Sequence, residues 1–242
     1  MRGLFFYLCL LLSFNSSVRA DAAPRPSEAQ YETRSDHHRD GIGKFYFGRE
    51  IAHVMGHQGA GWLERPTRES EERTDLLLEA LEIKPGEVVA DIGAGSGYFS
   101  WRMARRVGEK GKVFAVDIQQ EMLDLLMANM QRRQVAGIVQ PVLGTVQDPK
   151  LPAASVDLML LVDVYHEFDF PFEMTRAMIA GLKPGGRLVF VEYRGEDPEV
   201  PIKPLHKMTV AQVRKEMAVH SLKFDRNVRI LPQQHIIIFR KN

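Results

Sequence analysis

Three glycines at alternate positions follow an apolar run at residues 88–92, and this pattern constrains the fold more than any other in the sequence. They are Gly93, Gly95 and Gly97, and a helical pattern begins directly after them. Glycine has no Cβ, so the backbone of such a turn can approach a ligand closely. A buried strand that leads through glycines into a helix is typical of an open α/β sheet, in which the ligand lies beyond the carboxyl ends of the strands. We therefore expect a bound ligand at this turn.

The remaining sequence alternates between strand and helix patterns, as an α/β sheet requires. The predicted strands cover residues 88–92, 113–117, 139–143, 156–162, 187–193, 224–230 and 235–239. The predicted helices cover residues 67–82, 98–107, 120–133, 172–182 and 209–220, and one or two short helices are expected within residues 44–56. Apolar strands that alternate with helices indicate parallel crossover units. Only residues 231–234 join the last two strands, which is too short for a crossover, so these strands should pair antiparallel.

The N-terminal residues 1–20 have the three regions of an export signal. Arg2 is followed by an apolar stretch at residues 3–14, and Val18 and Ala20 supply the small residues of a cleavage site. The apolar stretch is shorter than the roughly 20 residues that a membrane-spanning helix needs. We expect a cleaved signal peptide and an exported, periplasmic protein, with an uncleaved N-terminal membrane anchor as the alternative.

Residues 21–41 are polar and charged, and we expect them to form a flexible segment ahead of a single domain at residues 42–242. The only cysteine is Cys9, inside the signal, so the mature chain can form neither a disulfide nor a thiolate metal site. The 32 Lys and Arg residues balance 31 Asp and Glu residues, whereas a protein that neutralises many phosphates has a basic excess. We therefore expect no nucleic-acid partner. No membrane span is expected after signal cleavage, and the oligomeric state stays open.

Two aspartates at predicted strand ends narrow the chemistry of the ligand. The spacing Gly-x-Gly-x-Gly differs from the dinucleotide fingerprint Gly-x-Gly-x-x-Gly, and Tyr98 stands where the third glycine would be. Asp91 suits a cation such as an ammonium group better than a pyrophosphate, with a charge partner of the helix N-terminus as the alternative. Asp117 ends the next strand, where a carboxylate can accept hydrogen bonds from both hydroxyls of a ribose. These positions predict a nucleoside that carries an amino acid and no phosphate, and they argue against a nicotinamide-dependent oxidoreductase.

Four segments in order resemble the class I methyltransferases that use S-adenosylmethionine. They are the glycine run at residues 88–97, Val116-Asp117 at the end of the second strand, Leu151-Pro152 followed by Ser155-Val-Asp157, and Leu182-Lys-Pro-Gly-Gly186 before the fifth strand. The resemblance extends over about residues 65–242 and is, more narrowly, to bacterial methyltransferase-domain proteins. It implies S-adenosylmethionine as the cofactor. It also implies a Rossmann-like α/β fold, with a seven-stranded, mostly parallel sheet, an antiparallel last strand and helices on both faces.

The same resemblance implies which residues contact the cofactor along its length. They are Asp91, Gly93, Gly95 and Gly97 for the methionine part, Asp117 for the ribose, Ile118 for the face of the adenine, and Asp148 for the adenine amino group. For Asp148 the alternative is a turn or helix cap. Asp163, just after the fourth strand, is also assigned to the cofactor.

The segment after the strand at residues 156–162 is expected to face the methyl group, as the resemblance implies. Methyl transfer is an in-line displacement that depends mainly on where the nucleophile is placed. His166 is the candidate general base, because imidazole accepts protons near neutral pH, and Tyr165 or Glu167 could orient an acceptor. The alternative is that His166 caps or packs the start of a helix. We expect a small-molecule acceptor, because the sequence lacks the Asn-Pro-Pro-Tyr and Asp-Pro-Pro-Tyr motifs of nucleic-acid amino methyltransferases.

Residues 42–65 are a possible substrate lid, because they are rich in aromatic residues and precede the first strand; packing against the sheet is the alternative. His53 and His57 would share one face of a helix there, a spacing that can bind zinc. No third ligand is evident, so we expect no metal site. The expected function is methyl transfer to a small-molecule acceptor. The alternative is a non-catalytic exported binding protein that keeps the methyltransferase fold.

Overall fold

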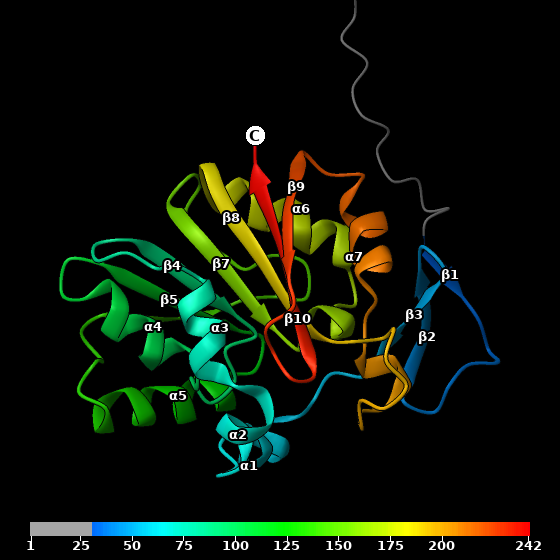
Figure 1. The fold of residues 1–242 in the computed structure, drawn as a ribbon, viewed down its shortest axis with the longest axis horizontal. Coiled ribbons are helices and arrows are strands. Elements are labelled where there is room, and N and C mark those ends of the chain that lie inside the picture. Colours follow the sequence, from blue (N-terminus) through cyan, green and yellow to red (C-terminus); the bar gives the residue numbers. More distant parts are fainter. Residues whose placement is uncertain (1–30) are drawn as a thin grey trace, which may run out of the picture.

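A seven-stranded β-sheet lies at the centre of the computed structural model, which describes residues 31–242 (Figure 1). In spatial order its strands are β6 (Val139–Leu143), β5 (Lys112–Asp117), β4 (Val88–Ile92), β7 (Val156–Val162), β8 (Leu182–Tyr193), β10 (Gln234–Lys241) and β9 (Leu222–Val228). The pairs from β6 to β8 are parallel, and β10 is antiparallel to both β8 and β9. The predicted α/β sheet with an antiparallel last strand is confirmed. The expected signal at residues 1–20 lies outside the described residues.

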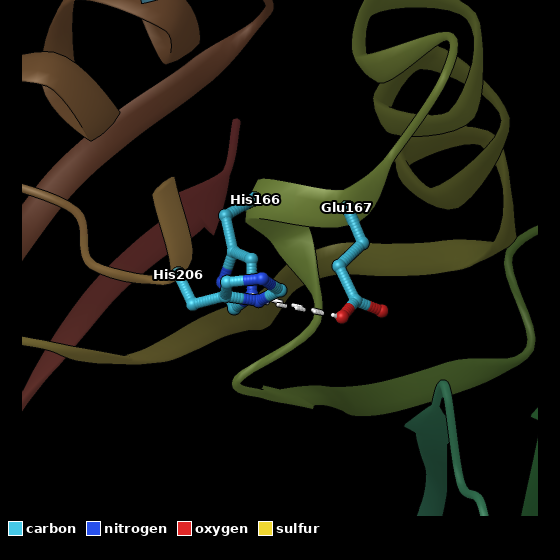
Figure 2. A group of neighbouring side chains, drawn as sticks. All are labelled: His166, Glu167 and His206. Carbon is cyan, nitrogen blue, oxygen red and sulfur yellow. Dashed lines mark hydrogen bonds and ion pairs between the residues drawn. The ribbon is translucent and has the colours of Figure 1, made fainter. Parts of the chain in front are cut away.

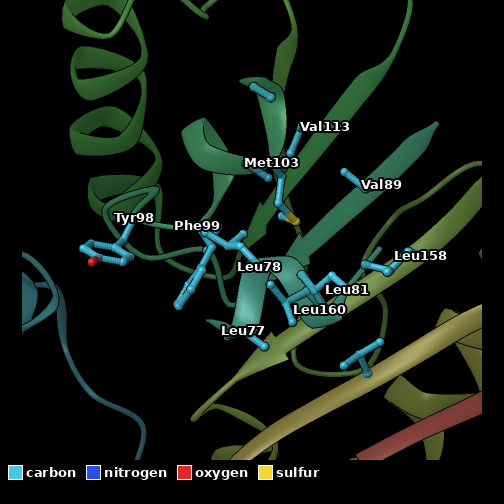
Figure 3. Packing of buried hydrophobic residues seen from close by; sticks show 14 of the residues in the cluster. Leu77, Leu78, Leu81, Val89, Tyr98, Phe99, Met103, Val113, Leu158 and Leu160 are labelled. Carbon is cyan, nitrogen blue, oxygen red and sulfur yellow. The ribbon is translucent and has the colours of Figure 1, made fainter. Parts of the chain in front are cut away.

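Helices cover both faces of this sheet, as expected. They are α3 (Thr74–Ala80), α4 (Ser100–Val107), α5 (Gln120–Arg132), α6 (Pro171–Gly181) and α7 (Val210–Met217). The first three pack on one face, where Leu77 and Met103 belong to the buried cluster shown in Figure 3. The last two pack on the other face, through side chains such as Met174. Adjacent residues of β4 divide between the two clusters, since Val89 belongs to the first and Ala90 to the second, as the period of two along a strand requires. Both faces are therefore filled, and the strand ends remain for a ligand.

Within residues 31–242, no helix has the length and apolar character needed to cross a bilayer.

A second, three-stranded antiparallel sheet lies beside the main one (Figure 1). Its strands are β1 (Tyr31–Thr33), β2 (Gly41–Tyr46) and β3 (Arg49–Ala52). The prediction of short helices within residues 44–56 is wrong, because Phe47 and Gly48 form a hairpin turn with φ of 49° and 87°. Such turns with two positive φ values match the twist of paired strands. The expectation of a flexible segment at residues 21–41 is wrong at its described end, where Tyr31 begins β1 and its hydroxyl donates a hydrogen bond to Glu173 Oε2 at 2.6 Å.

The helix expected at residues 67–82 is divided in two. α2 (Arg68–Glu72) and α3 are separated by Arg73, whose φ is 51°. A residue in the left-handed region cannot continue a right-handed helix, so the chain changes direction there. As a result, α3 packs on the sheet while α2 and the short α1 (Ala60–Leu63) lie near the strand ends (Figure 1).

A buried ion pair fixes the small sheet to the main domain. Arg49 of β3 contacts Glu216 of α7 through two hydrogen bonds, with Nε–Oε1 and Nη2–Oε2 distances of 2.8 and 3.1 Å. The Tyr165 hydroxyl donates a third hydrogen bond to Glu216 Oε2 at 2.7 Å. Arg49 Nη1 also donates to the carbonyl of His166 at 3.0 Å. Three segments that are distant in the sequence therefore meet at one pair of charges.

We predict that Glu216→Gln lowers the free energy of unfolding by about 3–5 kcal/mol, because it leaves the Arg49 guanidinium buried without its carboxylate. Urea denaturation measures the change. The matched control is Glu199→Gln, an exposed glutamate, which should change the free energy by less than about 0.5 kcal/mol. Equal effects of the two substitutions would show that the ion pair does not hold the small sheet.

Candidate active site

A cavity of about 770 Å³ opens at the carboxyl ends of β4, β5 and β7, within the roughly 300–1,000 Å³ typical of ligand pockets. From the main sheet and the loops after it, the lining residues include Gly93, Gly95, Asp117, Ile118, Asp163, Val164, His166 and Glu167. From residues 53–72 they include His53, Val54, Met55, Trp62, Leu63, Arg68 and Glu72, and from the loop between β8 and α7 they include Pro201, Ile202, Lys203 and His206. The strand ends thus form one wall, and two covering segments form the other.

The glycine turn after β4 supplies the floor of the cavity. Gly93 and Gly95 have φ of 69° and 52° and line the cavity. A Cβ at Gly95 would collide with Leu63 from the opposite wall, so a side chain there would fill the space between the walls. Gly97 is different, because a Cβ there would meet Leu126 and Met130 of α5 and because Gly97 does not line the cavity. Its lack of a side chain serves the close packing of the turn on α5, and its expected contact with the cofactor stays a prediction.

Asp117 joins two loops at the cavity wall. Its Oδ2 accepts a hydrogen bond from the backbone N–H of Gly95, and its Oδ1 accepts one from that of Gln119, each at 2.9 Å. Each oxygen keeps a second lone pair for a ligand. Burial raises the pKa of Asp117, although the backbone hydrogen bonds oppose this. Ile118 lines the same wall with 39% of its surface exposed, so both residues lie where the expected ribose and adenine contacts need them.

Asp91 lies under the turn and not on the cavity wall. Its carboxylate is buried and accepts a hydrogen bond from the Ser100 hydroxyl at 2.6 Å. Burial raises the pKa of Asp91 to about 6, against the opposing effect of the Ser100 hydrogen bond. Because Ser100 begins α4, the side chain is a partner of the N-terminal turn of this helix, as the alternative describes. The expected contact between Asp91 and the methionine part stays a prediction.

Asp148 also lies outside the cavity. It is half-buried, and its carboxylate pairs with Lys150 Nζ at 3.0 Å. A turn closed by the hydrogen bond from Thr145 N to the Asp148 carbonyl, at 2.9 Å, places it there. Val146 of the same loop lines the cavity instead. The expected contact of Asp148 with the adenine amino group is therefore wrong, and the turn alternative holds.

Asp163, just after β7, presents an unsatisfied acceptor. Gln234 Nε2 donates to its Oδ2 at 2.6 Å, but its Oδ1 is buried with no hydrogen-bond partner among the described residues. Burial raises the pKa of Asp163 well above its ordinary value, and the nearby carboxylate of Glu72 raises it further. Arg68 lines the cavity as well and pairs with Glu72, with an Nε–Oε2 distance of 3.0 Å. An acceptor without a donor and a guanidinium in one cavity match the ammonium and carboxylate groups of an amino acid. No sequence pattern had singled out Arg68 or Glu72.

His166 lines the cavity and belongs to a network of buried polar groups. It belongs to the short helix η3 (Tyr165–Glu167), and its Nδ1 lies 2.6 Å from Oε2 of Glu192 in β8. Its Nε2 lies 3.1 Å from Nδ1 of His206, which belongs to η4 (Pro204–His206). Glu167 Oε1 lies 3.9 Å from His166 Nε2 and 3.7 Å from His206 Nδ1 (Figure 2). The fold brings His206 into the site by placing the loop after β8 against η3.

The protonation of these groups follows from burial and charge. Burial lowers the pKa of His166, but the Glu192 carboxylate outweighs burial and the pKa is raised overall. Burial lowers the pKa of His206 to about 4 and raises that of Glu167 to about 7. Tyr165 is absent from the cavity wall, because its buried hydroxyl donates to Glu216. The expectation that Tyr165 orients an acceptor is therefore wrong, while His166 and Glu167 both lie on the wall.

Part of the expected lid at residues 42–65 does cover the cavity. Residues 53–55 and 62–63 line it, whereas Phe45 and Tyr46 of β2 are buried in the small sheet. His53 and His57 do not share a helix face, because His53 precedes the short η2 (His57–Gly59) in an irregular segment. The predicted pairing of these two histidines is therefore wrong.

Known proteins are similar to part of this chain in sequence and to most of it in fold. Residues 89–186 match the model of a family described as "Methyltransferase domain". The chain is 30% identical over 118 residues to a ubiquinone/menaquinone biosynthesis C-methyltransferase UbiE of Vibrio vulnificus (strain YJ016), covering 49% of this chain and 45% of that relative. For the protein of the same description from Azotobacter vinelandii (strain DJ / ATCC BAA-1303), the identity is 30% over 118 residues, covering 49% of this chain and 47% of that relative. The chain thus spans about half the length of the curated relatives it matches.

Solved structures share the architecture. A SAM dependent methyltransferase from Aquifex aeolicus superposes with a TM-score of 0.73 at 21% identity, covering 78% of this chain and 100% of that one. The [4+2]-cyclase SpnF superposes with a TM-score of 0.60 at 15% identity, covering 70% and 80% of the two chains. The likeness to these structures concerns the fold. Residues 89–186 are thus similar to a methyltransferase domain, and the chain shares the Rossmann-like fold of these structures.

S-adenosylmethionine fits the residues that line the cavity. The glycine turn leaves room that a Cβ would fill, and the buried Asp163 oxygen without a partner can accept a hydrogen bond from an ammonium group. Asp117 lies at the adjacent strand end, as a ribose contact requires.

We predict that Asp117→Ala weakens the binding of S-adenosylhomocysteine by roughly 10- to 150-fold, since hydrogen bonds to a charged group contribute about 1.5–3 kcal/mol. Titration calorimetry measures the affinity. Asp148→Ala is the control, because this aspartate follows the next strand but lies outside the cavity, and its affinity should equal that of the wild type. An unchanged affinity for Asp117→Ala would show that the ribose lies elsewhere.

Proposed function

We propose that the protein transfers the methyl group of S-adenosylmethionine to a small-molecule acceptor. The observation that carries the proposal is one cavity lined by two chemically different groups of residues. The first group is the glycine turn, Asp117 and Asp163, whose Oδ1 has no partner among the described residues, and the second is His166 and Glu167. The first group suits an adenosyl amino acid, and the second offers side chains that can hold or deprotonate an acceptor.

In and beside the first group of residues, each part of the cofactor has a candidate contact. Asp117 would accept hydrogen bonds from the ribose hydroxyls, and Ile118 would pack on the adenine. Asp163 would accept a hydrogen bond from the ammonium group, and Arg68 would pair with the carboxylate. The bound cofactor supplies a methyl group already activated by its positive sulfur. These residues of the chain would therefore only have to bind it and fix its direction.

In the second group of residues, His166 is the proposed proton acceptor for a nucleophile that carries a proton. Its Nδ1 contacts Glu192, so the ring is held with Nε2 on the side of His206 and Glu167. Large apolar side chains are exposed around the cavity, with exposures of 48% for Val54 and 52% for Trp62. Exposed apolar groups of this size in a pocket wall favour an acceptor with an apolar portion.

We also propose that the protein is exported to the periplasm. The support is the sequence of residues 1–20, with a basic start, an apolar stretch and a small-residue cleavage site. N-terminal sequencing of the protein from fractionated cells tests this. A periplasmic chain that begins near residue 21 is the expected result, and a membrane-bound chain that keeps its first residues would indicate an anchor instead.

The function is tested by titrating the purified protein with S-adenosylmethionine and S-adenosylhomocysteine, and then by following a labelled methyl group into a panel of small acceptors. We expect both ligands to bind and the label to be transferred. Absence of binding to either ligand would overturn the proposal. Binding without transfer to any acceptor would favour the alternative of a non-catalytic exported binding protein.

We predict that Asp163→Asn weakens the binding of the amino-acid end of the cofactor and leaves the binding of its adenosine end unchanged. It should weaken the binding of S-adenosylhomocysteine by roughly 10- to 150-fold, because the ammonium group loses its charged partner. Its affinity for 5′-methylthioadenosine, which lacks the amino-acid end, should be unchanged. Asp117→Ala should weaken both ligands, so calorimetry on the two variants forms a matched pair. Equal weakening of both ligands by Asp163→Asn would mean that Asp163 does not contact the ammonium group.

A further inference from the structure

We propose that His166, His206 and Glu167 bind one divalent transition-metal ion at the wall of the cavity. The three side chains come from η3 and η4 and point toward one another (Figure 2). All three residues line the cavity. Their chemistry was not apparent from the sequence, because His206 is 40 residues from His166 along the chain.

The separations of the donor atoms fit a single ion. They are 3.1 Å between His166 Nε2 and His206 Nδ1, and 3.9 and 3.7 Å from these nitrogens to Glu167 Oε1. An ion about 2.0–2.2 Å from each donor can contact atoms up to roughly 4.0–4.4 Å apart. All three separations lie below this limit, so one ion can contact all three donors.

Two further contacts hold the donor atoms in this direction. Glu192 is fully buried, and its Oε2 lies 2.6 Å from His166 Nδ1 while its Oε1 accepts from the backbone N–H of Tyr165. A carboxylate behind the second ring nitrogen is the usual support of a metal-binding histidine, because it fixes the tautomer and leaves Nε2 for the ion. Likewise, Glu167 Oε2 accepts a hydrogen bond from Met55 N at 3.3 Å, which leaves Oε1 toward the histidines.

A direct hydrogen bond between the two histidines is the competing explanation of the 3.1 Å contact. It accounts for the two rings, which pack edge to face at 80°. It does not account for Glu167, whose Oε1 lies close to both nitrogens but beyond hydrogen-bond distance of either. A metal ion in place of the shared proton accounts for all three side chains.

The donor set indicates the class of ion. Two imidazole nitrogens and one carboxylate oxygen suit zinc, ferrous iron, cobalt and nickel, whereas magnesium and calcium favour sites of oxygen donors alone. Three protein ligands leave a coordination position free, and all three residues line the cavity. If the proposed methyl transfer is correct, a metal-bound His166 cannot also accept the proton, and the free position would instead bind an acceptor that carries an oxygen donor; the metal site itself does not depend on that function.

The test uses tag-free, full-length protein that has been stripped with a chelator and titrated with Co²⁺, which reports its coordination through visible absorption. We expect one equivalent to bind, and Zn²⁺ to displace it. Glu192→Gln removes a supporting partner and should weaken Co²⁺ binding by about 10- to 100-fold. His206→Ala and Glu167→Gln each remove a ligand and should weaken Co²⁺ binding by at least as much. Circular dichroism checks that each variant is folded.

His53→Ala is the matched control, because His53 is an exposed histidine that lines the same cavity but lies outside the cluster. Its Co²⁺ affinity should equal that of the wild type. The proposal is overturned if the wild-type protein binds no stoichiometric Co²⁺, or if His206→Ala and Glu167→Gln bind it as tightly as His53→Ala does. Titration of the stripped protein with S-adenosylhomocysteine separates the two proposals. If S-adenosylhomocysteine binds and Co²⁺ does not, only the metal site is rejected. If Co²⁺ binds and S-adenosylhomocysteine does not, only the proposed methyltransferase function is rejected.

Discussion

The ion pair between Arg49 and Glu216 determines how the cavity is closed. Both charges are buried, with side-chain exposures of 10% and 0%, and such a pair is tolerated only where its geometry is good and its other hydrogen bonds are made. Here Glu216 also accepts from Tyr165 and Gln212, and Arg49 donates to the His166 carbonyl. The contact that attaches the small sheet therefore also positions the backbone of a cavity residue. The segment after β3, which covers the cavity, is consequently anchored in the folded core.

Carboxyl groups outnumber permanent cations in the cavity wall, where the basic residues are Arg68 and Lys203. Burial raises the pKa of Asp163 and raises that of Glu167 to about 7, which means that their charged forms are disfavoured until a cation is near. A positively charged ligand relieves this cost. Asp163 and Glu167 differ in the cation they suit, since Asp163 offers one oxygen to an ammonium group and Glu167 lies beside two histidines. The excess of acidic over basic side chains in the cavity wall thus favours a positively charged ligand such as the proposed cofactor.

The parts of the structure that depend on local pattern could be predicted from the sequence. The sheet follows from alternating apolar runs, the reversed last strand from a short connection, and the cavity wall at Asp117 from a carboxylate at a strand end. The wrong predictions concern segments whose conformation depends on more than the local sequence pattern. Residues 44–46 and 49–52 lie in strands because a two-residue turn pairs them, and Asp148 turns away because its loop closes on itself. His206 and Arg68 reach the cavity only through the path of the folded chain, so no spacing in the sequence could reveal them.

The fold alone does not determine the reaction. The same architecture is shared with a protein described as a methyltransferase and with one described as a [4+2]-cyclase, so the chemistry must come from the side chains at the cavity. In this chain the glycine turn and Asp117 belong to the part of the fold that the family model covers, whereas Arg49 and His206 lie outside residues 89–186. The segments before and after the matched region supply the cover of the cavity and the second histidine. Under the proposed methyl transfer, the choice of acceptor would therefore depend on those segments, and substitutions at His206 would bear on it more directly than substitutions in the glycine turn.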